Sequence, residues 1–299
     1  MLKSRYFSWI FALILCATGW AVANTDVRRW TGDGKSFSAE VVSFDPATGT
    51  VIFKGEDGKD FEMDEKQLSL TDQAWLREWV FIEEELKRKL EKVGGKTEHH
   101  VTAGKYPTDL FIYHPPDAGT LAERPMLILF SPTGRAQRNL LHYAEAAATL
   151  KIVLVACGQF RNDSGGQEAN DLRDRFGEIL PLIEKHVAHD PQRMMMGGSS
   201  GAAYRAFMYA ALFERPWFGI FSNGGWLGPD DVRERAYPPM RVAVVNGNND
   251  GAANGVVEEE SKILMARGCK IAVFSFEGAH QVAPPEHTTD ALRWILTGK

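Results

Sequence analysis

The sequence predicts an α/β protein in which helices cover both faces of a mostly parallel sheet, preceded by a small all-β domain and a charged helix. From about residue 104 onward, short apolar runs alternate with helix-prone segments, as in sheets built from strand–helix–strand units. Short strands separated by Gly/Asp turns occupy residues 24–70, and a charged, helix-prone run occupies residues 71–95. We therefore expect a signal peptide (1–23), a small β-domain (24–70), a linker helix (71–95) and a larger domain (104–299).

The first 23 residues have the pattern of a secretory signal peptide. Lys3 and Arg5 give a basic start, the run from Phe7 to Cys16 is apolar, and Ala21-Val22-Ala23 is a typical cleavage site. The apolar run is short for a bilayer span, which needs about 20 residues. We expect a secreted or periplasmic protein that is not held in the membrane after cleavage.

The segment 24–70 reads as a small antiparallel β-domain. The strands are expected at Phe37–Phe44, at Thr50–Lys54 and from Phe61, with turns at Gly32-Asp33-Gly34 and Glu56-Asp57-Gly58. With its Trp-Thr, Asp-Gly-Lys and Leu-Ser-Leu-Thr-Asp-Gln elements, the segment resembles the SH3-like domain first described in yeast actin-adaptor proteins. The resemblance implies a glycan or protein ligand, and a stabilising appendage without a ligand stays open as the alternative.

A helix is expected next, from about Asp72 to Val93. Ser69 or Thr71 can cap its first turn, oppositely charged residues recur at helical spacing, and Gly94-Gly95 ends it. The charge pattern predicts a solvated linker helix rather than a coiled coil.

The larger domain shows a repeated strand–helix alternation. Its apolar runs have the length and composition of buried parallel strands. The expected strands are Met126–Phe130, Ile152–Ala156, Met194–Met196, Phe218–Phe221, Val242–Val245 and Ile271–Phe276. The expected helices are Asn139–Leu150, Asp171–Val187, Ala202–Leu212, Val256–Ala266 and Thr288–Leu296.

The most informative motif lies between a predicted strand and a predicted helix. Gly197-Gly198-Ser199-Ser200-Gly201 satisfies G-x-S-x-G, the pattern of a sharp turn that exposes a nucleophilic serine. Glycines two before and two after the serine leave room for strand and helix to pack closely. Reading Ser200 as the nucleophile would put Ala202 at the second glycine position. The motif therefore favours Ser199.

A serine nucleophile needs a base and an acid to orient that base. Asp250 follows the apolar run Met240–Val245, and His280 follows Lys270–Phe276, so both lie where parallel strands end. His287 is the nearest rival histidine, and Asp230 and Asp231 are rival acids. The order serine, acid, histidine favours Asp250 and His280.

These motifs together resemble the α/β-hydrolase superfamily, in particular secreted esterases related to feruloyl esterases and polyhydroxybutyrate depolymerases. The resemblance spans about Tyr106 to Thr297 and rests on PMLILFS, DPQR, GGSSGA, NGNND and GAH. It implies a Ser199–His280–Asp250 triad, an acyl-serine intermediate and no cofactor. It also implies an oxyanion hole made by the amide of Ser200 and by Thr133 or Gly134.

The expected substrate is an acylated glycan or a small ester. Trp226, Phe160 and Arg135 follow predicted strand ends and are the candidate substrate-binding residues. Two other function classes stay open. One is a serine peptidase of the prolyl-oligopeptidase type, and the other is a non-catalytic binding protein, suggested by the unusual loop Ser131-Pro132-Thr133.

Composition and charge limit the kinds of partner and ligand that we expect. The formal net charge is -5, and no basic stripe is present, which argues against a nucleic-acid partner. Cys157 and Cys269 remain after signal cleavage, and we expect both to be buried free thiols. The His and Cys spacing indicates no metal site.

Overall fold

The computed structural model describes residues 28–55, 57–102, 108–116, 120, 123–132, 136–158, 169–213, 215–228 and 233–299. The predicted signal peptide lies outside the described residues. Within them, no helix combines the length and the apolar character that crossing a membrane requires.

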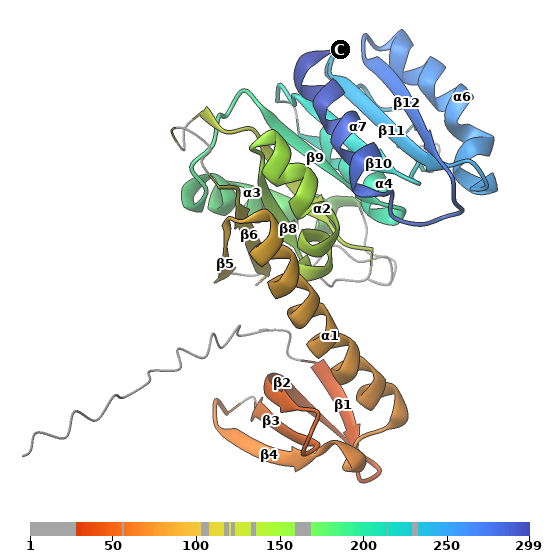
Figure 1. Cartoon of the computed structure of the whole chain (residues 1–299). Coiled ribbons are helices and arrows are strands. Elements are labelled where there is room, and N and C mark those ends of the chain that lie inside the picture. Colours follow the sequence, from red (N-terminus) through yellow and green to blue (C-terminus); the bar gives the residue numbers. More distant parts are fainter. Residues whose placement is uncertain are drawn as a thin grey trace, which may run out of the picture.

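The N-terminal unit is a four-stranded antiparallel sheet with its strands in chain order (Figure 1). Its core contains the fully buried Trp30 and Phe53, whose rings meet edge to face at 4.9 Å. The all-β prediction is confirmed, and the SH3-like classification stays a prediction. The strands are β1 (Arg28–Gly32), β2 (Lys35–Asp45), β3 (Thr50–Gly55) and β4 (Asp60–Asp64), followed by a 3-10 turn at Glu65–Gln67.

Helix α1 (Leu70–Val93) joins the two units and packs against both (Figure 1). Ser69 caps its first turn by accepting a hydrogen bond from the Asp72 amide, and Gly94 ends it, as the sequence predicts. Leu76 is buried in the core of the small sheet, whereas Leu86 is buried in the core of the larger unit. The expectation of a solvated helix is therefore wrong for this face of α1.

The larger unit is built on an eight-stranded sheet with the order β12-β11-β10-β9-β7-β8-β6-β5. Strands β7 to β12 are parallel to one another, whereas β6 runs antiparallel to β8 and to β5. Every predicted strand of this domain is present. The strands are β5 (Lys96–Val101), β6 (Asp109–His114), β7 (Met126–Phe130), β8 (Val153–Cys157), β9 (Met194–Ser199), β10 (Gly219–Asn223), β11 (Arg241–Gly247) and β12 (Lys270–Phe276).

Strands β5 and β6 are additions to the predicted architecture. Because β5 already belongs to the large sheet, the larger unit begins before the expected boundary at residue 104. The sequence KTEHHV of β5 is polar, as befits a strand at the edge of a sheet, and therefore lacks the apolar run that marked the other strands.

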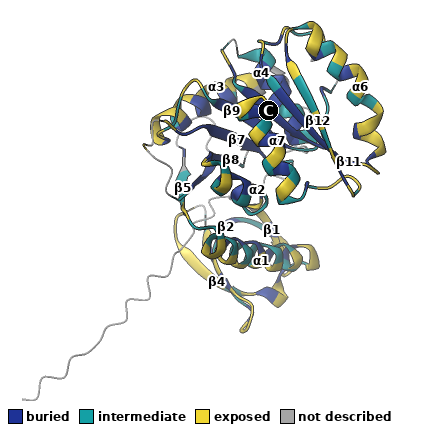
Figure 2. Cartoon of the chain, turned by 45° about the horizontal axis from the view of Figure 1, so that its top comes forward, coloured by how far each residue is buried: buried dark blue, intermediate teal, exposed yellow. Residues whose placement is uncertain are grey.

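Helices cover both faces of the sheet, with their buried sides against it and their exposed sides outward (Figure 2). Helices α2 (Ala136–Leu150) and α7 (Pro285–Thr297) share one core with the end of α1. Helices α3 (Ala169–His186), α4 (Gly201–Leu212) and α6 (Gly251–Ala266) contribute to the other. These layers confirm the predicted fold class.

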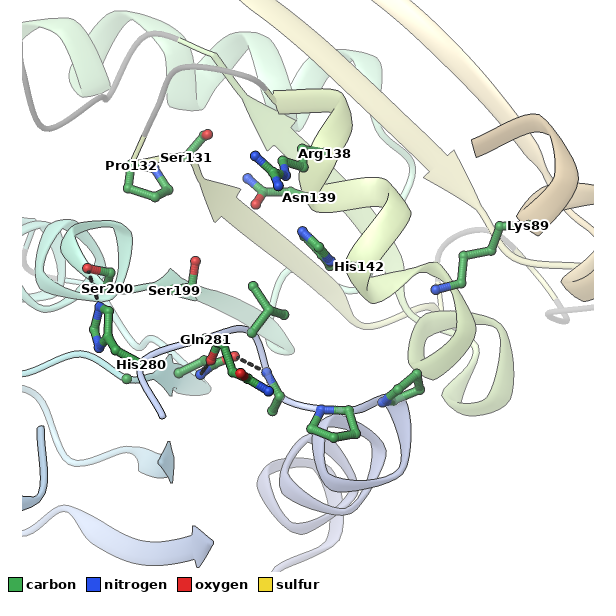
Figure 3. A pocket seen from close by; sticks show the side chains of 16 residues that line it. Lys89, Ser131, Pro132, Arg138, Asn139, His142, Ser199, Ser200, His280 and Gln281 are labelled. Atoms are coloured by element: carbon green, nitrogen blue, oxygen red, sulfur yellow. Dashed lines mark hydrogen bonds between the residues drawn. The ribbon is translucent and has the colours of Figure 1, made fainter. Parts of the chain in front are cut away.

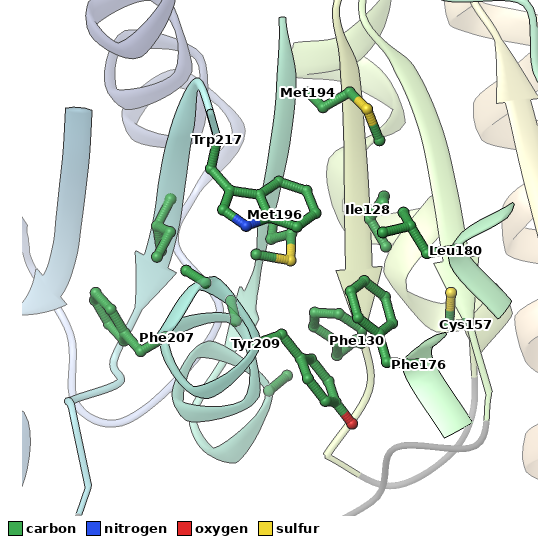
Figure 4. Packing of buried hydrophobic residues seen from close by; sticks show 14 of the residues in the cluster. Ile128, Phe130, Cys157, Phe176, Leu180, Met194, Met196, Phe207, Tyr209 and Trp217 are labelled. Atoms are coloured by element: carbon green, nitrogen blue, oxygen red, sulfur yellow. The ribbon is translucent and has the colours of Figure 1, made fainter. Parts of the chain in front are cut away.

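The core beneath α3 and α4 contains a stack of large aromatic side chains (Figure 4). Phe176 stacks on Tyr209 with ring centroids 4.4 Å apart, and Phe130 meets both rings. Cys157 and Cys269 are buried and free, as predicted. This packing fixes α4 against the sheet, and α4 begins at the serine turn.

Candidate active site

The turn between β9 and α4 presents Ser200. Ser200 has φ 54° and ψ −127°, which are sparsely populated values for a residue with a side chain and are typical of a strained functional turn. Gly198 makes the turn possible, because a Cβ there would lie 2.6 Å from the Cβ of Ala202 and 2.9 Å from the carbonyl oxygen of Phe130. The turn therefore exposes the second serine of the pair.

The predicted pairing of His280 with Ser199 is wrong, since it is Ser200 that contacts the imidazole. The Oγ of Ser200 lies 3.0 Å from Nε2 of His280 (Figure 3). Ser199 is the last residue of β9, paired in register with Asn223, and its side chain faces the buried Tyr143 hydroxyl. The turn therefore corresponds to Gly198-Ser199-Ser200-Gly201-Ala202, with alanine at the second glycine position of the motif. Ala202 is accommodated there because Gly198, which lies next to it, has no Cβ.

The backbone amide of Ser200 is not free for the oxyanion role that the sequence analysis expects of it. The Ser200 N–H donates to the carbonyl oxygen of Asn223 at 2.8 Å, so this donor already has an acceptor at the end of β10. Gly201 opens helix α4, and the first amides of a helix have no intrahelical acceptor. The amide after the exposed serine, that of Gly201, thus has no acceptor within its own helix.

His280 and Asp250 come together as the sequence predicts. Nδ1 of His280 lies 2.7 Å from Oδ2 of Asp250, whose side chain is 2% exposed. A carboxylate only accepts hydrogen bonds, so this contact places the ring proton on Nδ1 and leaves Nε2 to accept from Ser200. Asp250 also caps α6, because its Oδ1 accepts from the amide of Ala253 at 3.1 Å.

Asn223, which no sequence motif identified, holds the loop that carries His280. Asn223 is 1% exposed at the end of β10, and its Oδ1 accepts from the amide of Ala283 at 2.7 Å. Its Nδ2 donates to the carbonyl oxygens of Gln281 at 3.1 Å and Val245 at 3.3 Å. One buried amide therefore ties the histidine loop to two neighbouring strands.

We expect Asn223→Ala to lower the free energy of unfolding by about 1–3 kcal/mol, because it leaves buried backbone groups without partners. Chemical denaturation checks this. Asn248→Ala is the matched control: Asn248 is exposed and its Oδ1 accepts from Gly278 at 3.2 Å on the same loop. The control should change stability by no more than about 0.5 kcal/mol. Equal effects of the two substitutions would contradict the anchoring role.

A cavity of about 610 Å³ opens beside Ser200 (Figure 3). Besides the serine pair and His280, its wall includes side chains from α1 and α2 that the sequence reasoning missed, namely Lys89, Arg138, Asn139 and His142. Burial, helped by Arg138 and Lys89, lowers the pKa of His142 to about 4. His142 is therefore neutral at neutral pH.

The other predicted site residues have different outcomes. Thr133, Gly134, Arg135 and Phe160 lie outside the described residues, as do the rival acids Asp230 and Asp231. Trp226 lies beside His280, with ring centroids 6.4 Å apart, but is not among the described residues that line this cavity. His287 is in α7 against Phe276. Among described residues, no cluster of three or more His, Cys, Asp or Glu is arranged to hold a metal ion.

Comparison with known proteins shows similarity at the level of structure. No protein-family model and no curated protein matches the sequence. The S-formylglutathione hydrolase of Agrobacterium tumefaciens is similar over 68% of this chain and 95% of its own, with 14% identity and a TM-score of 0.54. A hyperthermophilic esterase from the archaeon Pyrobaculum calidifontis is similar over 72% of this chain and 88% of its own, with 12% identity and a TM-score of 0.54.

A Bacteroides ovatus protein provisionally named dipeptidyl aminopeptidase IV is also similar, with 8% identity and a TM-score of 0.54. It is matched over 89% of this chain but over only 42% of its own length. At these identities the likeness concerns the fold. The strand order, the serine turn and these structural similarities show that the chain has the α/β-hydrolase fold.

Proposed function

We propose that the protein is a serine hydrolase that cleaves carboxylic esters through an acyl-serine intermediate on Ser200. The observation that carries the proposal is the convergence of Ser200, His280 and Asp250 from three separate loops, with contacts of 3.0 Å and 2.7 Å. A serine is a weak nucleophile unless a base is in hydrogen-bond reach and a third group orients that base. This arrangement also argues against a purely binding role.

In the proposed reaction, Oγ of Ser200 attacks the ester carbonyl carbon while Nε2 of His280 takes the hydroxyl proton. Collapse of the tetrahedral intermediate breaks the bond to the alkoxy oxygen, which receives that proton from His280 and leaves as the alcohol. A water molecule then attacks the acyl-serine, again losing a proton to His280, and releases the acid. Asp250 stabilises the imidazolium formed in each half-reaction.

The oxyanion of each tetrahedral intermediate needs hydrogen-bond donors. The Gly201 amide lies at the N-terminus of α4, where the helix dipole also favours negative charge. A second donor is expected from the loop after β7, at Thr133 or Gly134. Each such donor is worth about 3–4 kcal/mol of transition-state stabilisation.

An ester substrate is favoured over a peptide by the comparisons. The hydrolase and the esterase are matched over most of their lengths, whereas the aminopeptidase is matched over less than half of its chain. We therefore expect kcat/KM for 4-nitrophenyl acetate and butyrate to exceed that for dipeptidyl 4-nitroanilides by at least about 100-fold, or about 2.7 kcal/mol. Higher activity on the anilides would move the assignment to the peptidase class.

We further propose that the protein is exported and acts on acylated glycans or small esters outside the cytoplasm. The basic start, apolar run and Ala-Val-Ala site of residues 1–23 support export. N-terminal sequencing of the protein from a cell-envelope or medium fraction tests this, with Asn24 as the expected first residue. The small β-domain is proposed as a glycan- or protein-binding module, tested by whether its presence increases retention on a glycan matrix.

A further inference from the structure

The wall of the cavity made by α1 and α2 carries positive charge. Figure 3 shows Lys89 from α1 and Arg138 and His142 from α2 on this wall, across from the Ser200–His280 contact. None of the described lining residues is an aspartate or glutamate. The described lining therefore holds two formal cations and no formal anion.

Both cationic side chains are held in place by contacts that use only part of their donor capacity. Lys89 Nζ donates to the carbonyl oxygen of Leu141 at 2.7 Å, and Arg138 Nη1 donates to Oε1 of Glu78 at 3.1 Å. An ammonium has three N–H donors and a guanidinium five, and each of these contacts uses one. Glu78 offsets part of the Arg138 charge. The carbonyl group that contacts Lys89 carries no formal charge and therefore does not neutralise the ammonium.

Lys89 is partly buried, which strengthens the electrostatic interaction between its ammonium group and a neighbouring anion. Burial lowers its pKa, with Glu145 and Glu85 acting in the opposite direction. An anion next to a partly buried ammonium interacts more strongly than it would in open solvent, because less water screens the pair. A substrate anion at this wall would compensate the ammonium for its lost hydration.

We infer that the wall formed by Lys89 and Arg138 binds an anionic group, such as a carboxylate, on the ester that Ser200 cleaves. The inference rests on the proposed function and narrows its substrate class to esters with a negative charge on the acid or the alcohol part. Arg can bind a carboxylate through two N–H groups, and Lys adds a point charge beside it. His142, neutral at neutral pH, can donate or accept a hydrogen bond there without changing the net charge.

This arrangement also gives α1 a role in substrate selection. The same helix contributes Leu76 to the core of the small sheet and Lys89 to the cavity. Helix α1 therefore connects the core of the small sheet to the cavity wall, where Lys89 contacts the carbonyl oxygen of Leu141 in the larger unit.

The experiment compares esters that differ only by a carboxylate or a methyl group. One pair is 4-nitrophenyl 4-carboxybenzoate and 4-nitrophenyl 4-methylbenzoate, with the charge on the acid. The other is 4-carboxyphenyl acetate and 4-methylphenyl acetate, with the charge on the alcohol. For each pair, the ratio of kcat/KM for the anionic ester to that for the neutral ester is measured, and the pair that responds identifies where the charge lies.

In Lys89→Met/Arg138→Gln this ratio should fall about tenfold or more for at least one pair, the usual effect of losing a hydrogen-bonded charge. Lys87→Met is the matched control, because Lys87 is an exposed lysine of α1 outside the cavity lining. It should leave both ratios unchanged. Ratios that stay within about twofold of wild type for both pairs would overturn the inference. If the double variant unfolds, Arg138→Gln alone carries the test, since its side chain is 49% exposed.

A binding measurement separates this inference from the proposed function. Calorimetry with Ser200→Ala measures the affinity for the anionic and the neutral ester without any turnover. The esters are methyl 4-carboxybenzoate and methyl 4-methylbenzoate where the acid-side pair responds, and 4-carboxyphenyl acetate and 4-methylphenyl acetate where the alcohol-side pair responds. Adding Lys89→Met/Arg138→Gln should weaken binding of the anionic ester about tenfold relative to the neutral one. Equal weakening of both esters, or none, would overturn the anionic site whether or not Ser200 is a catalytic residue.

Discussion

Ser200→Ala is expected to lower kcat for ester hydrolysis by a factor on the order of 10⁵–10⁶, because the variant lacks the oxygen that forms the acyl intermediate. The hydroxyl is removed at a residue of intermediate exposure whose backbone amide still bonds to Asn223. The fold should therefore survive, and the unfolding midpoint should stay close to that of wild type. Initial rates on 4-nitrophenyl acetate measure the loss. Labelling by a fluorophosphonate probe should disappear with it.

Ser199→Ala is the matched control, since it removes a hydroxyl from the adjacent residue in the same cavity. Its Oγ is not the one that contacts His280, so turnover and probe labelling should both persist. The reverse outcome, an inactive Ser199→Ala and an active Ser200→Ala, would restore Ser199 as the nucleophile and contradict the geometry.

The serine pair shows where sequence reasoning reached its limit. Ser199 and Ser200 both have a glycine two residues before them. The sequence analysis therefore chose between them by the residue two positions later, which is glycine for Ser199 and alanine for Ser200. The deciding quantity is where the strand stops. Ser199 still pairs with Asn223 in the sheet, and the positive φ falls on Ser200. A run of small residues such as GGSSGA does not reveal whether the strand ends one residue earlier or later, and that residue decides which serine is exposed.

The central strands of the large sheet were predictable because they are buried on both faces. Strands β7 and β8 each have all five residues buried, which produces the continuous apolar runs MLILF and VLVAC. Asp250 and His280 follow two further strands at the same edge of the sheet, so their chain order and position were enough to pair them. The contact of 2.7 Å confirms that part of the prediction.

The cationic wall could not be predicted in the same way. Lys89 belongs to a helix whose charges read as solvated, and Arg138 lies on α2 among residues without a motif. Lys89 and Arg138 line the same cavity because α1 packs on α2. One contact between these helices is the hydrogen bond that Nε2 of Gln137 donates to Oε1 of Glu83 at 2.6 Å. Contacts of this kind join residues about fifty positions apart and leave no local pattern.

Asp250→Asn is expected to lower kcat on the order of 10⁴, the second-largest effect among these variants. An asparagine amide in place of Oδ2 donates to Nδ1 of His280, which shifts the ring proton to Nε2. Nε2 then cannot accept the proton of Ser200, which keeps its hydroxyl and loses its base. Steady-state kinetics on 4-nitrophenyl butyrate check the loss, and KM should change little because Asp250 lies behind His280 and does not line the cavity.

Comparing Asp250→Asn with Asp250→Ala separates the catalytic role of this residue from its structural one. Asparagine keeps an oxygen that can accept from the Ala253 amide and cap α6, whereas alanine removes the cap at a cost of about 1 kcal/mol. Both variants should therefore lose activity, but Asp250→Ala should be the less stable of the two in chemical denaturation. Because the kinetic loss comes from the ring proton and the stability loss from the helix cap, an Asp250→Asn variant with near-wild-type kcat would show that His280 does not depend on Asp250 as its orienting acid.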